Sequence, residues 1–216
     1  MTRRLRVDAT DIARIAVFAA IVAVLGLPGG FTVFGAVPIT AQTLGVMLAG
    51  AILGPWRGAI SMLVFLALVA VGLPLLSGGR GGIGVFAGPS AGYLIGWVVG
   101  AFVIGAIVHA RGRITWTRTI TGVLVGGIVT IYAFGIPVQA LVTRLPLAET
   151  ALQSTVFLPG DLVKAAIAVA ITMTLARAYP RAFRSLDRRR STTAAPAAQP
   201  SQAAQPAQTS DGSRVR

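Results

Sequence analysis

This chain of 216 residues contains six apolar stretches, and its Arg residues lie almost entirely between them and at the chain ends. Only 12% of the residues are charged, whereas a soluble domain carries about 25%. The mean hydropathy of +0.78 agrees with this shortage of charge. A surface so poor in charged groups is not stable in water, so a typical soluble enzyme is excluded. The sequence predicts an all-α integral membrane protein of one compact domain.

We expect a bundle of six transmembrane helices. Several of the apolar stretches are short for a hydrocarbon core about 30 Å thick, which takes about 20 helical residues, so kinked or sheltered helices are expected. The fifth is long enough to contain a break, which we expect near Gly135-Ile136-Pro137 because proline interrupts helical hydrogen bonding. The predicted spans cover residues 12–27, 38–53, 59–73, 89–109, 114–142 and 161–179.

The Arg residues predict the orientation of these helices. The chain has 18 Arg, a single Lys and a formal net charge of +13. Cytoplasmic loops of membrane proteins carry an excess of Lys and Arg. If both termini are cytoplasmic, only Arg80 and Arg144 fall outside. This indicates a multi-pass protein of the cell membrane, in contact with membrane lipid. The same placement explains the basic charge, so no nucleic acid partner is expected.

The predicted domain organisation has three parts. Residues 1–11 form a cytoplasmic N-terminus, residues 12–180 the six-helix substrate-binding domain, and residues 181–216 a basic and then disordered cytoplasmic tail rich in Ala, Pro, Gln, Ser and Thr. The first apolar stretch follows basic residues, as in a signal peptide. Cleavage is therefore the alternative to a retained helix, but retention keeps the charge pattern intact.

Small residues recur four positions apart in several spans. In membranes such pairs let two helix backbones approach closely. For the glycine pairs 50/54, 96/100 and 122/126, packing inside the bundle is the favoured interpretation. For the first span, docking against a separate membrane partner is an equal alternative. The residues concerned are Ala16, Ala19, Ala20 and Ala23.

The sequence carries no recognisable catalytic or metal-binding motif. There is no GxxxxGK[ST] nucleotide loop, no HExxH and no Cys. The one His, His109, belongs to no recognisable catalytic motif with an acid or a Ser. We therefore expect neither catalytic residues, nor a metal, nor a cofactor, and the chain is not expected to be an enzyme.

Asp161 and Lys164 are the strongest candidates for ligand binding. They follow Pro159-Gly160, which we expect to end the preceding loop, at the predicted outer start of the sixth span. Side chains three apart share one face of a helix. The chain uses Arg for the positive charges that orient its helices in the membrane. Its one Lys, beside an acid at the membrane edge, is therefore expected to have another role. Ionisable groups there are costly unless they pair or line a cavity. A self-satisfied ion pair is the alternative.

Three further segments are expected at the same outer side. The glycine-rich loop around Arg80 suits anion binding through its amides and guanidinium, with a flexible linker as the alternative. Gln42 and Thr43 offer neutral donors and acceptors, and Tyr93 offers a ring or an interfacial anchor. Together these groups suit a small amphipathic solute with a carboxylate and a cyclic amide or urea.

Over residues 10–180 the chain resembles BioY, the biotin-binding membrane subunit (S component) of energy-coupling factor (ECF) transporters. The motifs are specific only in combination and in this order. They are Val37-Pro38-Ile39-Thr40-Ala41-Gln42-Thr43-Leu44-Gly45, Leu53-Gly54-Pro55-Trp56-Arg57-Gly58, Gly72-Leu73-Pro74, Gly78-Gly79-Arg80-Gly81-Gly82, Gly88-Pro89-Ser90-Ala91-Gly92-Tyr93-Leu94 and Gly160-Asp161-Leu162-Val163-Lys164. Ala41, Trp56 and Ser90-Ala91 depart from the family pattern and affect the pocket shape and the cytoplasmic turn.

The resemblance implies uptake of biotin captured from outside. It places Asp161 on a ureido N–H, Lys164 on the ureido oxygen and Arg80 or loop amides on the carboxylate, with the opposite orientation left open. The remaining pocket residues would be Gln42, Thr43, Gly79, Gly82 and Tyr93. An S component for another small water-soluble vitamin is the alternative.

The implied partners are a transmembrane coupling subunit, docked on the small residues of the first helix, and two ABC-type ATPases. The resemblance leaves open whether transport needs these ATPases, and a homo-oligomer also stays open.

Overall fold

The computed structural model describes residues 8–30 and 37–179. Within them the regular structure is helical, apart from one isolated bridge between Leu76 and Arg80. The first seven residues and the predicted tail 181–216 lie outside the described residues. The helices are α1 (Ala9–Val24), α2 (Gln42–Leu53), α3 (Pro55–Ala70), α4 (Ala91–Val108), α5 (Trp116–Leu124), α6 (Ile131–Thr143), α7 (Leu147–Ser154) and α8 (Leu158–Ala178).

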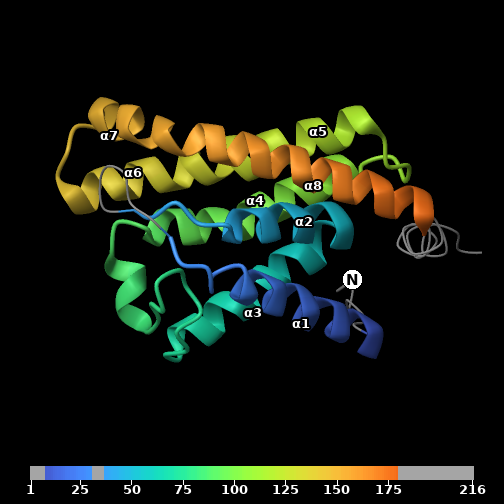
Figure 1. The fold of residues 1–216 in the computed structure, drawn as a ribbon, viewed down its shortest axis with the longest axis horizontal. Helices are drawn as coiled ribbons and strands as arrows, with labels where there is room; N and C mark the ends of the chain where they lie inside the picture. The colour runs from blue at the N-terminus through green and yellow to red at the C-terminus, as the bar shows by residue number, and fades with distance from the viewer. Residues whose placement is uncertain (1–7, 31–36, 180–216) are drawn as a thin grey trace, which may run out of the picture.

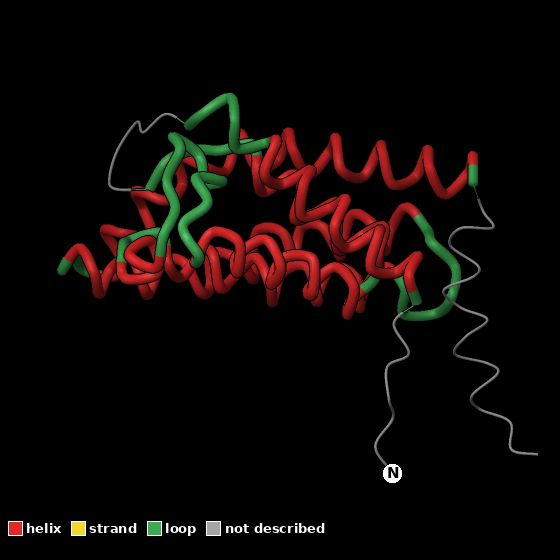
Figure 2. Tube along the Cα trace, turned by 90° about the horizontal axis from the view of Figure 1, so that it is seen from below, coloured by secondary structure: helices red, strands yellow, loops and turns green. Residues whose placement is uncertain are grey.

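These helices pack side by side with their axes along the length of the molecule (Figure 1). α2 and α4 lie in the middle, with α1 and α3 on one side and α5, α6 and α8 on the other. The connecting loops gather at the two ends of the bundle (Figure 2). The described chain begins and ends at the same end, because α1 starts there and α8 finishes there.

In the part of the chain that the structure describes, three continuous helical segments are long and apolar enough to cross a membrane, namely Ala91–Val108, Trp116–Thr143 and Leu147–Ala178. The apolar helices α2 and α3 are shorter. The prediction of a helical membrane protein is therefore supported, whereas the count of six spans depends on how the short helices sit in the bilayer. α7, which no predicted span contains, joins α6 to α8 through a 3₁₀ turn, Thr155–Phe157.

A one-residue turn makes α2 and α3 a tight hairpin. α2 ends at Leu53 and α3 begins at Pro55, so Gly54 alone reverses the chain. Gly54 has φ +81°, a conformation that residues with a Cβ rarely adopt. Proline suits the first position of α3 because its missing N–H would have no helical acceptor there.

The expected break in the fifth span is wrong in its position. Pro137 lies inside the continuous helix α6, and the irregular segment is instead a π-helical turn, Val125–Thr130, between α5 and α6. Neighbouring groups in a membrane bundle can satisfy the carbonyl that a proline leaves free, so the helix continues.

Close backbone contact explains the glycines of the long spans. A Cβ on Gly100 would lie 2.5 Å from the carbonyl oxygen of Gly126. One on Gly50 would lie 2.6 Å from the carbonyl oxygen of Ala101. Both separations are too short for any side chain, so these glycines let α4 approach its neighbours. Packing inside the bundle, the favoured interpretation of the glycine pairs, is confirmed at these positions.

Candidate functional site

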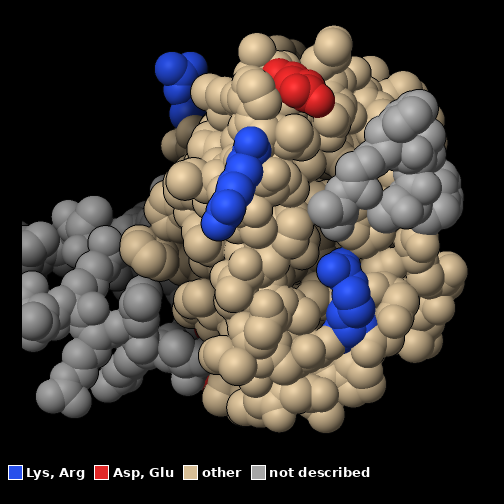
Figure 3. Space-filling model, turned by 90° about the vertical axis from the view of Figure 1, so that its left-hand side faces the viewer, with Lys and Arg blue, Asp and Glu red and all other residues tan. Residues whose placement is uncertain are grey.

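A cavity opens near the end of the bundle where α4 and α8 begin. Its walls come from α2, α4, α6 and α8 and from the segments that precede α2 and α4. The cavity volume is about 60 Å³. One water molecule needs about 10–15 Å³ by the same measure, so the cavity has room for more than a single ordered water. The surface of this end carries only scattered charged side chains (Figure 3).

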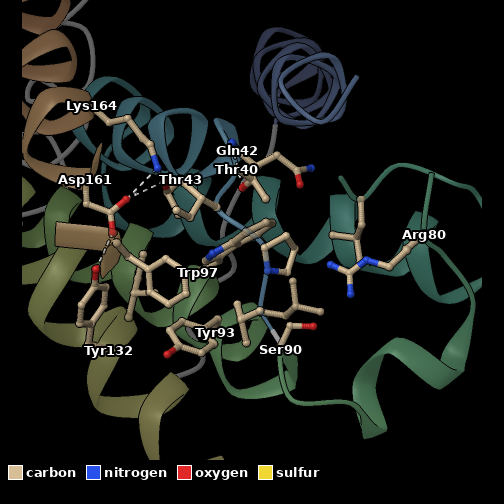
Figure 4. Close-up of a pocket in the computed structure, with 17 residues that line it drawn as sticks. Thr40, Gln42, Thr43, Arg80, Ser90, Tyr93, Trp97, Tyr132, Asp161 and Lys164 are labelled. Atoms are coloured by element: carbon tan, nitrogen blue, oxygen red, sulfur yellow. Dashed lines mark hydrogen bonds and ion pairs between the residues drawn. The ribbon is translucent and has the colours of Figure 1, made fainter. Parts of the chain in front are cut away.

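Asp161 and Lys164 form an ion pair in the wall of this cavity (Figure 4). The Lys164 Nζ donates to Asp161 Oδ1 at 2.8 Å and to Thr43 Oγ1 at 3.0 Å. The Thr43 hydroxyl lies 3.3 Å from Asp161 Oδ1 and donates to it, and the Tyr132 hydroxyl donates to Asp161 Oδ2 at 2.7 Å. The structure thus brings together Asp161, Lys164 and Thr43, three of the predicted site residues.

The start of α8 places the two charges as the sequence predicts. Asp161 lies in the first turn, where a negative charge is favourable, and Lys164 is three residues further on the same face. The expectation that Pro159-Gly160 ends a loop is wrong, because α8 already begins at Leu158. Proline is tolerated there since the first turn of a helix leaves its N–H groups without helical acceptors.

The two charges of this cluster are largely shielded from water. The side chains of Asp161 and Lys164 are only 6% and 15% exposed. Charges so far from water are stable only when they are paired and hydrogen-bonded. Asp161 accepts three hydrogen bonds and a carboxylate has about four lone-pair sites, while Lys164 donates two of its three N–H bonds. One acceptor site and one donor therefore stay available to a ligand that presents both kinds of group.

Gln42 lines the cavity, but its polar atoms bind the protein itself. Its Nε2 donates to the carbonyl oxygens of Val22 at 3.1 Å and of Leu75 at 3.0 Å. Its Oε1 accepts from the Ser77 N–H at 3.2 Å. The side chain thus ties the end of α1 and the loop after α3 to the start of α2. Its role as a ligand-binding residue stays a prediction.

Tyr93 contributes its ring to the cavity wall. Its hydroxyl donates to Gln139 Oε1 at 2.8 Å and lies 3.1 Å from Ser154 Oγ. The ring packs edge-on against Tyr132 and Phe157. Gly135 leaves room for this ring, since a Cβ at that position would overlap it. The geometry therefore assigns the hydroxyl to a network between α4, α6 and α7, and leaves the ring as the surface a ligand would meet.

The glycine-rich loop is only partly in the site. Arg80 lines the cavity on the side away from Asp161 (Figure 4). Gly79 and Gly82 are not among the lining residues, and their N–H groups donate to the carbonyl oxygens of Leu76 and Val69. These two amides are therefore engaged within the chain, and of this loop the Arg80 side chain is the part that faces the cavity.

Tyr132 and Trp97, like Phe157, are aromatic residues of the wall that sequence reasoning missed. Tyr132, which binds Asp161, and Trp97, one turn after Tyr93 on α4, both line the cavity. Each lies in a long apolar stretch where an aromatic residue is ordinary. The four-residue spacing from Tyr93 to Trp97, which puts them on one helix face, was the available signal.

The small residues of α1 divide between two faces. Ala16 and Ala20 are exposed, Ala23 is half-buried, and Ala19 is 3% exposed within the core beside α3. Of these four residues, Ala16 and Ala20, which are four positions apart, present an open small-residue surface. Ala19 instead lets α1 pack closely on the bundle.

The fold and the site together define a class. A bundle of apolar helices encloses a cavity with a buried acid and ammonium, and no group of three or more metal-ligating side chains occurs in residues 8–30 and 37–179. This is the arrangement of a membrane protein that binds a solute. The family model described as the BioY family matches residues 1–181, and the chain belongs to that family. The resemblance inferred from the motifs is confirmed, and the family is one of transport components rather than enzymes.

Known relatives agree with this assignment. The biotin transporter BioY of Rhizobium etli is 45% identical over 79% of this chain and 95% of its own length. The probable biotin transporter BioY of Bacillus subtilis is 47% identical, covering 78% of this chain and 91% of the relative. A crystal structure of the S-component for biotin from an ECF-type ABC transporter superposes with a TM-score of 0.75 at 33% identity, covering 82% of this chain and 95% of that one.

Proposed function

We propose that this chain captures biotin at the outer face of the cell membrane for uptake into the cell. The observation that carries the proposal is the Asp161–Lys164 pair in the cavity wall, with one acceptor site and one donor unused. A cyclic urea offers the complementary N–H and carbonyl oxygen side by side. The names of these relatives, biotin transporter BioY or probable biotin transporter BioY, favour biotin over another vitamin.

In the proposed pose the ureido ring lies against α8. Asp161 accepts a ureido N–H and Lys164 donates to the ureido oxygen. The rings of Tyr93 and Phe157, which also line the cavity, would cover the apolar part of the ligand. Arg80, on the other side of the cavity, would pair with the carboxylate. Gln42, Gly79 and Gly82 would act by holding the wall and the loop in place.

The proposed topology has six spans, formed by α1, α2, α3, α4, the continuous α5–α6 segment and α8. Both termini are cytoplasmic, and the cavity end faces outward. The domain limits are those expected from the sequence, 1–11, 12–180 and 181–216. Support comes from the described Arg residues of the inter-helix turns and helix ends opposite the cavity. They are Arg57, Arg111, Arg113, Arg118 and Arg177.

The lack of Cys makes this topology simple to test. Gly84→Cys adds a thiol near the cavity end, and Ala110→Cys adds one at the opposite end; both positions are exposed. A membrane-impermeant maleimide applied to intact cells is expected to label only the first. Labelling of only the second would overturn the orientation.

We further propose that α1 docks on a transmembrane coupling subunit served by two ABC-type ATPases. The exposed pair Ala16 and Ala20 supports this, because small residues allow a second helix to approach closely. The name of the solved relative, an S-component of an ECF-type transporter, supports the same kind of partner.

Equilibrium binding of radiolabelled biotin to the purified chain tests the proposed function. Saturable binding that excess unlabelled biotin displaces, and that thiamine and riboflavin do not, is the expected result. Displacement by another vitamin at equal concentration, or no saturable binding, would contradict it.

A further inference from the structure

Trp97 carries a buried hydrogen-bond donor that no described residue satisfies. Its side chain lies on α4 and packs against Phe65, with the ring centroids 6.0 Å apart. The residue is only 5% exposed, and within residues 8–30 and 37–179 its Nε1 has no acceptor. Leaving such a donor unpaired destabilises the folded chain. Buried donors in proteins are nearly always paired, so this one needs an explanation.

The position of Trp97 supplies that explanation. Ser77 Oγ and Thr172 Oγ1 are the other buried polar atoms without a partner in the described segments, but neither residue lines the cavity. Trp97 does line it. Figure 4 shows the nitrogen-bearing edge of the indole on the side of the cavity where Thr43 and Asp161 lie, away from Arg80. The unpaired donor thus faces the region where the Asp161–Lys164 pair offers its unused valences.

We propose that the Trp97 indole N–H and the Lys164 ammonium donate together to the ureido oxygen of the ligand. This inference rests on the proposed function, because biotin supplies the urea. A urea oxygen has two lone pairs and accepts two hydrogen bonds, and Lys164 has one N–H unused. Because Asp161 accepts a ureido N–H, the three residues together bind both the N–H and the oxygen of the urea. Trp97 is then a specificity-determining residue.

Specificity follows from the rigidity of this donor. The indole nitrogen can only donate a hydrogen bond, unlike a hydroxyl group, which can also accept one. A ligand that places its own N–H at this point therefore leaves two donors facing one another. Sites built to hydrogen-bond one group discriminate strongly against analogues that fail to satisfy their buried polar atoms. 2-Iminobiotin is such an analogue, since an imino nitrogen with N–H donors replaces the ureido oxygen.

The test replaces Trp97 by 3-benzothienylalanine, in which sulfur takes the place of the indole N–H and the ring shape is kept. We expect biotin affinity to fall about tenfold, and the preference for biotin over 2-iminobiotin to narrow by a similar factor. The same replacement at Trp116, which is exposed on α5, is the control and is expected to change neither value. If the chain modified at position 97 keeps the biotin affinity of the unmodified chain and its preference for biotin over 2-iminobiotin, the inference is overturned.

A second measurement applies if the replacement impairs folding. The chain has three Trp, so Trp56→Phe with Trp116→Phe leaves Trp97 as the only indole. With ¹⁵N-labelled Trp, its Nε1–H resonance is expected to shift downfield when biotin binds. Biotin binding without such a shift would overturn the role of Trp97 and leave the proposed function intact. Absence of biotin binding to the unmodified chain would overturn both.

Discussion

The Nζ of Lys164 lies 3.0 Å from the Oγ1 of Thr43, although the two residues are 121 positions apart in the chain. This contact joins α8 to the first turn of α2 inside the cavity wall. It gives the ammonium a neutral partner besides Asp161, and it brings α2 into direct contact with the candidate ligand site.

Thr43→Val is therefore expected to weaken biotin binding by about tenfold or more. Valine has a similar shape but cannot accept from Lys164 or donate to Asp161, and a hydrogen bond to a charged group contributes about 1.5–3 kcal/mol. Thr43→Ser keeps the hydroxyl and should bind nearly as well as the unmodified chain. Isothermal calorimetry on the detergent-purified variants measures both. Equal affinity of the Val and Ser variants would show that the hydroxyl is irrelevant to binding.

Tyr132→Phe is expected to reduce biotin affinity about tenfold without unfolding the bundle. The change removes the 2.7 Å hydrogen bond to Asp161 Oδ2 and so frees the carboxylate to move from its position. The matched control is Tyr93→Phe, whose hydroxyl binds Gln139 and Ser154. That control should lower the thermal midpoint more than it lowers affinity. The reverse pattern would contradict the separate roles assigned to the two hydroxyls.

Gln42→Leu is expected to destabilise the fold by about 3 kcal/mol or more. It leaves two carbonyl oxygens and one N–H without their partner, and each buried unsatisfied group costs about 1–3 kcal/mol. Denaturation in detergent measures the loss. The control is Thr40→Val, because Thr40 only accepts one N–H, from Gln42, at 3.3 Å. A Gln42→Leu variant as stable as that control would refute the tie between α1, α2 and the loop after α3.

Ala16→Leu with Ala20→Leu is expected to abolish energised biotin uptake while biotin binding to the purified chain stays unchanged. The larger side chains would block a second helix from the open face of α1. Uptake by cells and co-purification of the coupling subunit measure the effect. Leu at Ala106, which is exposed on α4, serves as a control for added surface bulk on another helix. Undiminished uptake by the double variant would remove α1 from the docking surface.

The sequence predicts the features that depend on local spacing. Asp161 and Lys164 share a face because they are three residues apart, and the apolar stretches mark most of the helices. Contacts between distant segments were beyond reach: Tyr132 meets Asp161 only because the fold brings the start of α6 within side-chain reach of the start of α8. The break expected at Pro137 failed for a related reason, since tertiary packing decides where a long membrane helix becomes irregular.

The site residues show the same division. Gln42 is recognisable as a polar residue in an apolar context, but its partners come from α1 and from the loop after α3. A sequence pattern does not reveal whether such an amide faces a ligand or the backbone. Gly79 and Gly82 follow the motif of the family, yet their amides donate to carbonyl oxygens of the loop and of α3. The residue type was predicted correctly, and the direction of each polar group required the fold.

The most direct test of the central claim compares three variants of the ion pair by equilibrium biotin binding. Lys164→Met and Asp161→Asn each leave an unpaired buried group, so the double variant Asp161→Asn with Lys164→Met is the decisive one, because it removes both charges. Replacing a buried pair by neutral groups often leaves stability nearly unchanged. The double variant is expected to keep its thermal midpoint and to lose biotin affinity by at least about 100-fold, the equivalent of two hydrogen bonds to charged groups. A double variant that folds and binds biotin as tightly as the unmodified chain would contradict the account.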